Sequence, residues 1–298
     1  GGITGGFAGV DIFFVISGFL ITGQLVREVE RSGRISLPRF YARRAKRLFP
    51  AAATVLLTTA ALTLLFLPKI TWRDTGGDLV ASAAYVINWR LASRSVDYLA
   101  EDTAASPVQH FWSLAVEEQY YIIWPVLLLG LALLIRARRW PVRAVMATGL
   151  AAIVAPSLIW SIHLTSADPA RAYFVTTTRL WELGIGALVA IGATVWSRLA
   201  PPIGAALAWG GLALIAAGLL VQDTTTPWPG SAALVPVLGT AAVILGGFSA
   251  GPLGPVRVLG WAPMVWIGGL SYSLYLWHWP LVVVAEHRRV GGVERRRP

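Results

Sequence analysis

The chain alternates between long apolar runs and short polar connectors. A helix needs about 20 mainly apolar residues to cross a bilayer, and runs of that length recur along the sequence. Connectors such as Pro201-Pro202 and residues 224–229 are rich in the proline and threonine typical of turns. The pattern predicts an all-α fold, a polytopic integral membrane helical bundle of about eight spans in one domain over residues 1–298. The predicted spans are residues 7–26, 48–67, 113–135, 144–163, 176–196, 203–221, 232–249 and 265–285.

The composition supports a protein that is surrounded by membrane lipids. Of the 298 residues, 56% are hydrophobic and 13% are charged, and the mean hydropathy is +0.63. A soluble domain carries about 25% charged residues, and its core could not bury this much apolar surface. The chain has 0 Cys and 4 His, which excludes disulfides and thiol nucleophiles and makes a metal site unexpected.

The positive charge is placed where it would orient a membrane protein. The net charge is +10, but the basic residues cluster between apolar runs, so we expect no nucleic-acid partner. The stretch 27–47 and the cluster Arg136, Arg138, Arg139 and Arg143 are both predicted to be cytoplasmic. Two crossings then place residues 69–110 outside. The apolar stretch 79–92 is too short to span, which predicts one interfacial or re-entrant helix there.

The densest group of polar side chains begins at His110. On a helix, Ser113, Glu117 and Tyr121 follow one face at intervals of four residues, and Glu118 lies beside them. These groups could orient an acceptor hydroxyl or tune a nearby base. The alternative is a helix start that Ser113 caps, with both acids in water, and the pattern leaves the two interpretations open.

Two other spans carry charged or small residues. Arg179 and Glu182 form an i, i+3 pair, which either seats the helix as an ion pair or holds an anionic or carbonyl group. Asp11 introduces a run in which Ser17 and Gly18 form a small patch. The pattern favours helix packing at this patch over close approach of a ligand.

Arg43, Arg44 and Arg47 form a basic face at the predicted inner surface. They could bind the phosphates of an acyl-CoA, although lipid headgroups are the commoner partners of such a face. His278 lies in an aromatic belt, where a lone histidine is more often an interhelical hydrogen bonder than a catalyst.

Five segments together resemble the transmembrane acyltransferase-3 family, the O-acetyltransferases of bacterial surface polysaccharides. They stand in that family's order and at similar spacing. The segments are residues 9–22, 40–50, 110–125, 179–190 and 268–280.

The resemblance implies an acyltransferase of the bacterial inner membrane, with about ten spans when complete. It would move an acyl group, with acetyl expected, from cytoplasmic acyl-CoA to a hydroxyl of an extracytoplasmic glycan or lipid-linked glycan. It implies a donor face at Arg43, Arg44 and Arg47. Supporting catalytic roles are implied for the following residues: Glu117, Ser113, Arg179, Glu182 and Asp11.

The chain departs from the family in one respect. The family's first span carries an Arg and a His regarded as the catalytic base, and no equivalent pair is present here. We therefore expect a domain truncated at both ends and inactive alone, with no SGNH esterase-type domain within residues 1–298. The alternatives are a transporter or flippase for a lipid-linked glycan and a noncatalytic membrane scaffold.

Overall fold

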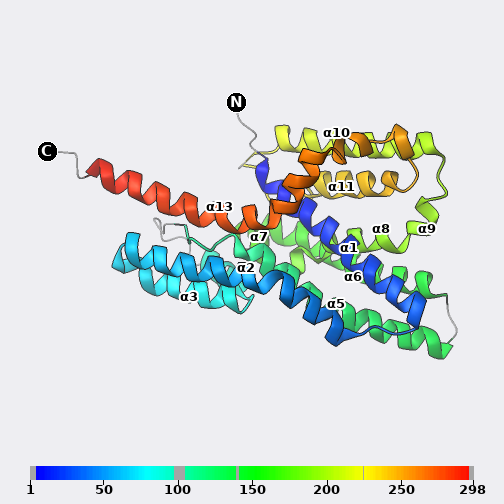
Figure 1. The fold of residues 1–298 in the computed structure, drawn as a ribbon, viewed down its shortest axis with the longest axis horizontal. Helices are drawn as coiled ribbons and strands as arrows, with labels where there is room; N and C mark the ends of the chain where they lie inside the picture. The colour runs from blue at the N-terminus through cyan, green and yellow to red at the C-terminus, as the bar shows by residue number, and fades with distance from the viewer. Residues whose placement is uncertain (1–4, 97–104, 139–140, 224, 295–298) are drawn as a thin grey trace. The chain divides into compact units, whose positions relative to one another are not determined.

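The computed structural model describes residues 5–96, 105–138, 141–223 and 225–294, apart from the side chains of 95–96, 132–138, 142 and 288–294. This part of the chain holds 13 α-helices and no strand, which confirms the all-α prediction (Figure 1). The side chains of Arg136, Arg138 and Arg139 lie outside the described residues. Contacts divide the chain into two compact units, Gly1–Ile35 with Tyr120–Val265 (unit 1) and Ser36–Gln119 with Trp266–Pro298 (unit 2).

Five helical stretches of the described residues are long and apolar enough to cross a membrane. Two further predicted spans are shorter helices, of 12 residues in α8 (Leu180–Ile191) and 14 in α11 (Leu234–Gly247). The last lies in a 33-residue helix, α13 (Ala262–Glu294). The chain is thus a multi-pass membrane protein. The five stretches are Gly6–Ser32, Leu37–Phe66, Phe111–Leu131, Arg143–Ala167 and Pro201–Val221.

Unit 1 is a helical bundle in which α1 (Gly9–Ser32) packs against α8 and α11. In addition, α8 packs against α6 and α10 against α11 (Figure 1). The approaches of α1 to α8 and of α10 to α11 are close because glycines such as Gly18, Gly186 and Gly211 face the neighbouring backbone. The other helices of the unit are α6 (Val142–Ala167), α7 (Pro169–Phe174), α9 (Ala193–Trp196), α10 (Pro201–Val221), α12 (Val256–Leu259) and the part of α5 (Phe111–Arg138) from Tyr120.

The two connectors predicted to be cytoplasmic meet at one end of unit 1. Arg143, at the start of α6, donates to Glu30 near the end of α1 at 2.9 Å. It also donates to the carbonyl of Ile191, the last residue of α8, at 2.8 Å. One guanidinium therefore joins three helix ends, two of which the positive-inside rule assigns to the same face.

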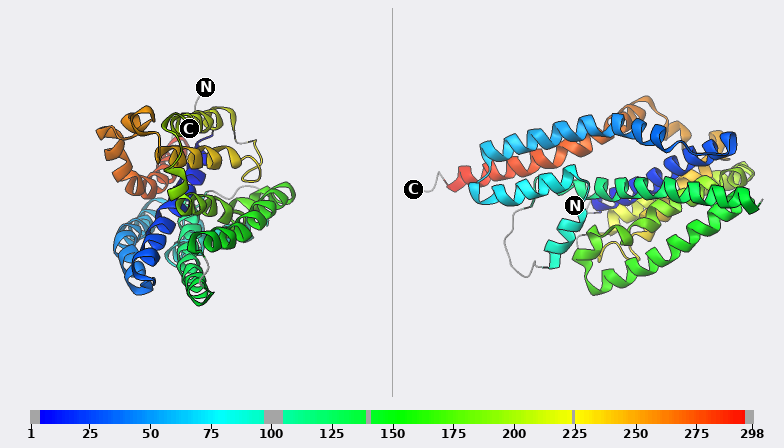
Figure 2. Two further views of the ribbon diagram at one scale, coloured as in Figure 1. Left: turned by 90° about the vertical axis from the view of Figure 1, so that its right-hand side faces the viewer. Right: turned by 90° about the horizontal axis from the view of Figure 1, so that it is seen from below.

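Unit 2 packs α2 (Leu37–Phe66), the first residues of α5 and α13 around a shared apolar core. Within this unit α2 and α13 run alongside each other (Figure 2). The buried core residues are Ala52, Val55, Ala81, Ile87, Val108, Phe111, Leu114, Ala115 and Leu276.

The prediction of one helix over residues 79–92 is wrong. Two helices, α3 (Trp72–Ala83) and α4 (Ile87–Val96), meet at a break where Tyr85 has a φ of 53°. No Gly or Pro marks the break in the sequence. A distant side chain stabilises it instead, because Gln119 donates to the carbonyl of Tyr85 and to Asn88 Oδ1, both at 2.9 Å.

Candidate functional site

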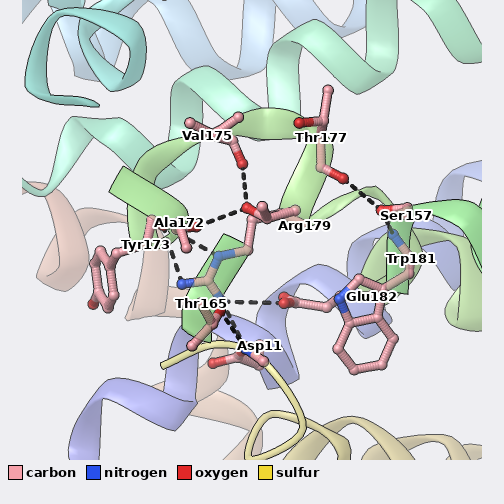
Figure 3. Close-up of polar contacts among 12 residues, drawn as sticks. Asp11, Ser157, Thr165, Ala172, Tyr173, Val175, Thr177, Arg179, Trp181 and Glu182 are labelled. Carbon is pink, nitrogen blue, oxygen red and sulfur yellow. Dashed lines mark hydrogen bonds and ion pairs between the residues drawn. The ribbon is translucent and has the colours of Figure 1, made fainter. Parts of the chain in front are cut away.

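The most deeply buried charged group of unit 1 is centred on Arg179. Its side chain is 1% exposed, and those of Asp11 and Glu182 are both 0% exposed. Arg179 Nη1 donates to Asp11 Oδ1 at 2.8 Å and to Glu182 Oε1 at 3.0 Å (Figure 3). The predicted i, i+3 pair is therefore present, and Asp11 joins it from α1.

The rest of the Arg179 guanidinium is held by backbone. Its Nε and Nη2 donate to the carbonyl of Tyr173 at 3.2 and 3.1 Å, and the Tyr173 ring lies 5.1 Å from Cζ. That carbonyl is placed by the short helix α7, which Asp168 caps by accepting from the Arg171 amide at 3.0 Å. A guanidinium has five N–H donors, and these four hydrogen bonds to Asp11, Glu182 and Tyr173 use most of them.

Two carboxylates therefore share one guanidinium in a buried setting. The second oxygens, Asp11 Oδ2 and Glu182 Oε2, are buried and have no hydrogen-bond partner among the described residues. Buried carboxylate oxygens without partners are costly in an apolar environment. Either oxygen of the Arg179 centre (Arg179, Asp11 and Glu182) can therefore accept a hydrogen bond from a hydroxyl group.

The small patch on α1 faces protein. Gly18 lies against the backbone of Leu183 in α8, so helix packing explains this glycine. Ser17 is hydrogen-bonded to Tyr121 of α5. One turn further along both helices, Trp124 Nε1 donates to Thr22 Oγ1 at 2.8 Å. Tyr121 and Trp124 thus attach α5 to α1.

In unit 2, the two predicted acids Glu117 and Glu118 lie beside Arg44. Arg44 Nη2 lies 3.2 Å from Glu118 Oε1 and 3.9 Å from Glu117 Oε1, and all three side chains are at most 16% exposed. The interpretation of two acids in water at a helix start is therefore wrong. Burial, together with Glu118 and Glu117, raises the pKa of Tyr85 to about 12, so this phenol remains a hydrogen-bond donor.

The three arginines of the predicted basic face do not share one environment. Arg43 and Arg47, four residues apart on α2, are exposed, whereas Arg44 is turned toward the acids of α5. Arg43 and Arg47 therefore remain accessible to an anionic ligand, and Arg44 links their helix to Glu117 and Glu118.

Ser113 contacts another helix and does not act as an N-cap. Its Oγ lies 2.6 Å from the hydroxyl of Tyr275 in α13, and that hydroxyl donates to the carbonyl of His110 at 2.8 Å. Ser113 is also the third residue of α5, inside the helix. The hydroxyl pair therefore joins α5 to α13 within unit 2.

His110 is the interhelical histidine. Pro280 has no N–H, so within α13 the carbonyl of Leu276 loses its usual helical donor. His110 Nε2 donates to that carbonyl at 3.1 Å. Burial, and then the neighbouring His278, lowers the pKa of His110 to about 3, so the ring is neutral.

The role expected for His278 is thus taken by His110. His278 is exposed, and its Nδ1 donates at 2.6 Å to the carbonyl of Tyr275 in its own helix. The sequence pattern did not single out Tyr173, Tyr85 or Tyr275. The spacing of Pro280 after Leu276 was the signal that could have identified an acceptor for His110.

Within the described ranges, no group of three or more His, Asp or Glu side chains is placed to hold a metal ion. The charged residues that the sequence singled out form two arrangements, one in each unit. The Arg179 centre has carboxylate oxygens that can accept a hydrogen bond from a hydroxyl group. The Arg44 centre (Arg44, Glu117 and Glu118) lies beside exposed arginines that can bind anions.

The fold and these centres define a class, that of multi-pass helical membrane proteins with charged groups buried inside their bundles. A family model described as the acyltransferase domain matches residues 2–289. The chain therefore belongs to the acyltransferase-3 family, which confirms the resemblance seen in its five segments.

Curated relatives resemble nearly the whole chain. Peptidoglycan O-acetyltransferase OatA of Listeria monocytogenes is 32% identical over 293 residues, 94% of this chain and 45% of the relative. O-acetyltransferase OatA of Staphylococcus aureus is 31% identical over 300 residues, 97% of this chain and 48% of the relative. The putative peptidoglycan O-acetyltransferase YrhL of Bacillus subtilis is 32% identical over 291 residues, which cover 94% of this chain and 45% of the relative. The chain thus spans about half the length of the curated relatives it matches. No solved structure matches it.

Proposed function

We propose that the chain is the membrane part of an enzyme of the bacterial cytoplasmic membrane that O-acetylates a glycan. The donor would be acetyl-CoA on the cytoplasmic side, and the acceptor a hydroxyl of peptidoglycan or of its lipid-linked precursor outside. The family and the names of the relatives support an acyltransferase acting on such a glycan. Membrane helices that bury charged groups support a path for polar substrates between them.

The observation that carries the proposal is the position of Arg44. Arg43 and Arg47 would bind the donor's phosphates through charge-assisted hydrogen bonds. From the same stretch of α2, Arg44 reaches Glu118 at 3.2 Å. The arginines that would bind phosphate and the buried carboxylates therefore belong to two contacting helices of one unit, α2 and α5, as a donor site leading into the bundle requires.

The proposed reaction is an attack by the acceptor hydroxyl on the thioester carbonyl. A C–O ester bond forms, the C–S bond breaks, and the thiolate of CoA leaves and takes up a proton. The hydroxyl's proton would go to a general base, for which the resemblance implies a His of the family's first span. Glu117 and Ser113 in unit 2 would have supporting roles in orienting the base or the acceptor. For the Arg179 centre of unit 1, a supporting role is proposed from the family resemblance alone.

Removing the two exposed arginines should weaken donor binding selectively. In the full-length protein, Arg43→Ala with Arg47→Ala should raise the dissociation constant of acetyl-CoA about tenfold or more, because each charge-assisted hydrogen bond contributes about 1.5–3 kcal/mol. Equilibrium binding of labelled acetyl-CoA to protein in vesicles measures this. Arg34→Ala, an exposed arginine just before α2, is the matched control and should leave binding unchanged.

Two outcomes would contradict the proposal. Equal loss of binding in the Arg34 control would mean that any positive charge at this surface attracts the anionic donor. If the wild-type protein bound no acetyl-CoA while glycan export failed in cells lacking it, the transporter alternative would replace the enzyme.

A further inference from the structure

The hairpin of α3 and α4 in unit 2 holds a group of charges that the proposed transfer does not use. The side chain of Asp78 is 2% exposed, and it accepts from Arg90 Nε at 2.7 Å and from Arg94 Nη1 at 3.0 Å. Arg94 Nη2 also donates to Asp74 at 2.7 Å. A buried carboxylate without a cationic partner would be strongly destabilising, so these ion pairs stay formed. They hold both arginines in place.

The two arginines are used differently. Both terminal nitrogens of Arg94 donate to carboxylates, whereas Arg90 donates to a carboxylate through Nε alone. Among the described residues, Nη1 and Nη2 of Arg90 have no hydrogen-bond or ion-pair partner, and its side chain is 35% exposed. Arg90 therefore presents a terminal edge with several N–H donors that remain unused.

Gly77 makes room for the Arg90 side chain. A Cβ built on Gly77 would collide with Arg90 Nη2 and would lie 2.8 Å from its Cζ. The guanidinium thus lies directly over the backbone of α3, and any larger residue would displace it. Asp78 fixes the guanidinium at Nε, and Gly77 makes the space beneath it.

We propose that Arg90 binds an oxyanion of the acceptor, a carboxylate or a phosphate, on the outer side of the membrane. This rests on the proposed function. A guanidinium edge offers two parallel N–H donors that fit a carboxylate or phosphate in a bidentate pair. An arginine already held in place loses little conformational entropy on binding. The positive-inside rule assigns both ends of residues 69–110 to the acceptor's side, so the hairpin between them packs against α2 from that side.

The competing explanation is that Arg90 only neutralises Asp78. Arg94 already pairs with Asp78 at 3.0 Å, so Arg90 is not its sole counterion. A purely structural Arg90 would affect all acceptors alike, through stability. A binding Arg90 would distinguish acceptors by their charge.

The test compares a charged acceptor with a neutralised one. Full-length protein in phosphatidylcholine vesicles receives labelled acetyl-CoA and either a peptidoglycan disaccharide-pentapeptide or the same compound with its carboxylates converted to methylamides. Arg90→Ala should raise the KM of the charged acceptor about tenfold, the loss of one charged hydrogen-bonded contact. The KM values of the methylamide and of acetyl-CoA should not change.

Three variants sharpen the comparison. Gly77→Ala should raise the same KM without removing any charge, because it displaces the guanidinium. Arg90→Lys should lie between wild type and Arg90→Ala, since it keeps the charge and loses the planar edge. Arg73→Ala is the control, an exposed arginine of the same hairpin with no ion pair, and should leave every KM unchanged.

The proposal is overturned if Arg90→Ala slows both acceptors equally, or if its effect appears only when phosphatidylglycerol is added to the vesicles, which would make a lipid headgroup the ligand. If wild type acetylates neither compound, the proposed function has failed. Calorimetric binding of the two compounds to wild type and Arg90→Ala then still decides the role of Arg90, with weaker binding of the charged compound alone as the supporting result.

Discussion

Arg179→Met is expected to destabilise the full-length protein by about 3–5 kcal/mol, the cost of removing one partner from a buried ion pair. The cost should fall at the upper end of that range because Asp11 and Glu182, both 0% exposed, would lose their shared cation together. Thermal unfolding in detergent, with the amount of protein recovered from membranes, measures the effect.

A companion variant separates stability from function. Combining Arg179→Met with Asp11→Asn and Glu182→Gln removes all three charges and nearly preserves their volume, so most of the lost stability should return. If the Arg179 centre supports acetyl transfer, this triple variant should fold and remain inactive. Full activity in the triple variant would limit the centre to a structural role. A midpoint for Arg179→Met equal to that of wild type would contradict the ion-pair argument itself.

Gly18→Ala and Gly186→Ala should each separate α1 from α8. A Cβ at Gly18 would collide with the carbonyl oxygen of Leu183, and a Cβ at Gly186 with that of Val15. Both obstacles are backbone atoms and cannot rotate away, so a cost of about 1–3 kcal/mol each, typical of overpacking, is the minimum expected. Unfolding midpoints of the single variants in detergent measure this.

Gly210→Ala is the control for that prediction. Gly210 is also a helical glycine of unit 1, and nothing lies within 4 Å of the position its Cβ would take. Alanine favours a helix by about 0.8–1.0 kcal/mol over glycine, so this variant should be neutral or slightly stabilised. Equal destabilisation at all three positions would show that glycine is needed for some reason other than helix contact.

The Arg179 and Gly18 predictions concern the same pair of helices. The contacts of Gly18 and Gly186 let α1 and α8 approach, and that approach lets Asp11 of α1 reach Arg179 at the start of α8, which also pairs with Glu182. We therefore expect Gly186→Ala to weaken the ion pair as well as the packing, so its effect and that of Arg179→Met should be less than additive.

The sequence by itself determined the fold class and the membrane location, because a bilayer requires long apolar helices and their length and composition can be counted. It also identified the contact between Arg179 and Glu182, since a spacing of three residues on a helix brings side chains together without help from the rest of the chain. The order of its five segments was enough to identify the family.

Only the tertiary structure decided which distant residues meet. Asp11 lies 168 positions from Arg179, and Arg44 lies 74 positions from Glu118, and helical periodicity carries no information about either pair. The same holds for the break at Tyr85, which depends on Gln119, and for His110, which takes the carbonyl that Pro280 leaves without a donor. Local spacing fixes how one helix displays its side chains. The neighbour that those side chains contact depends on how the helices pack.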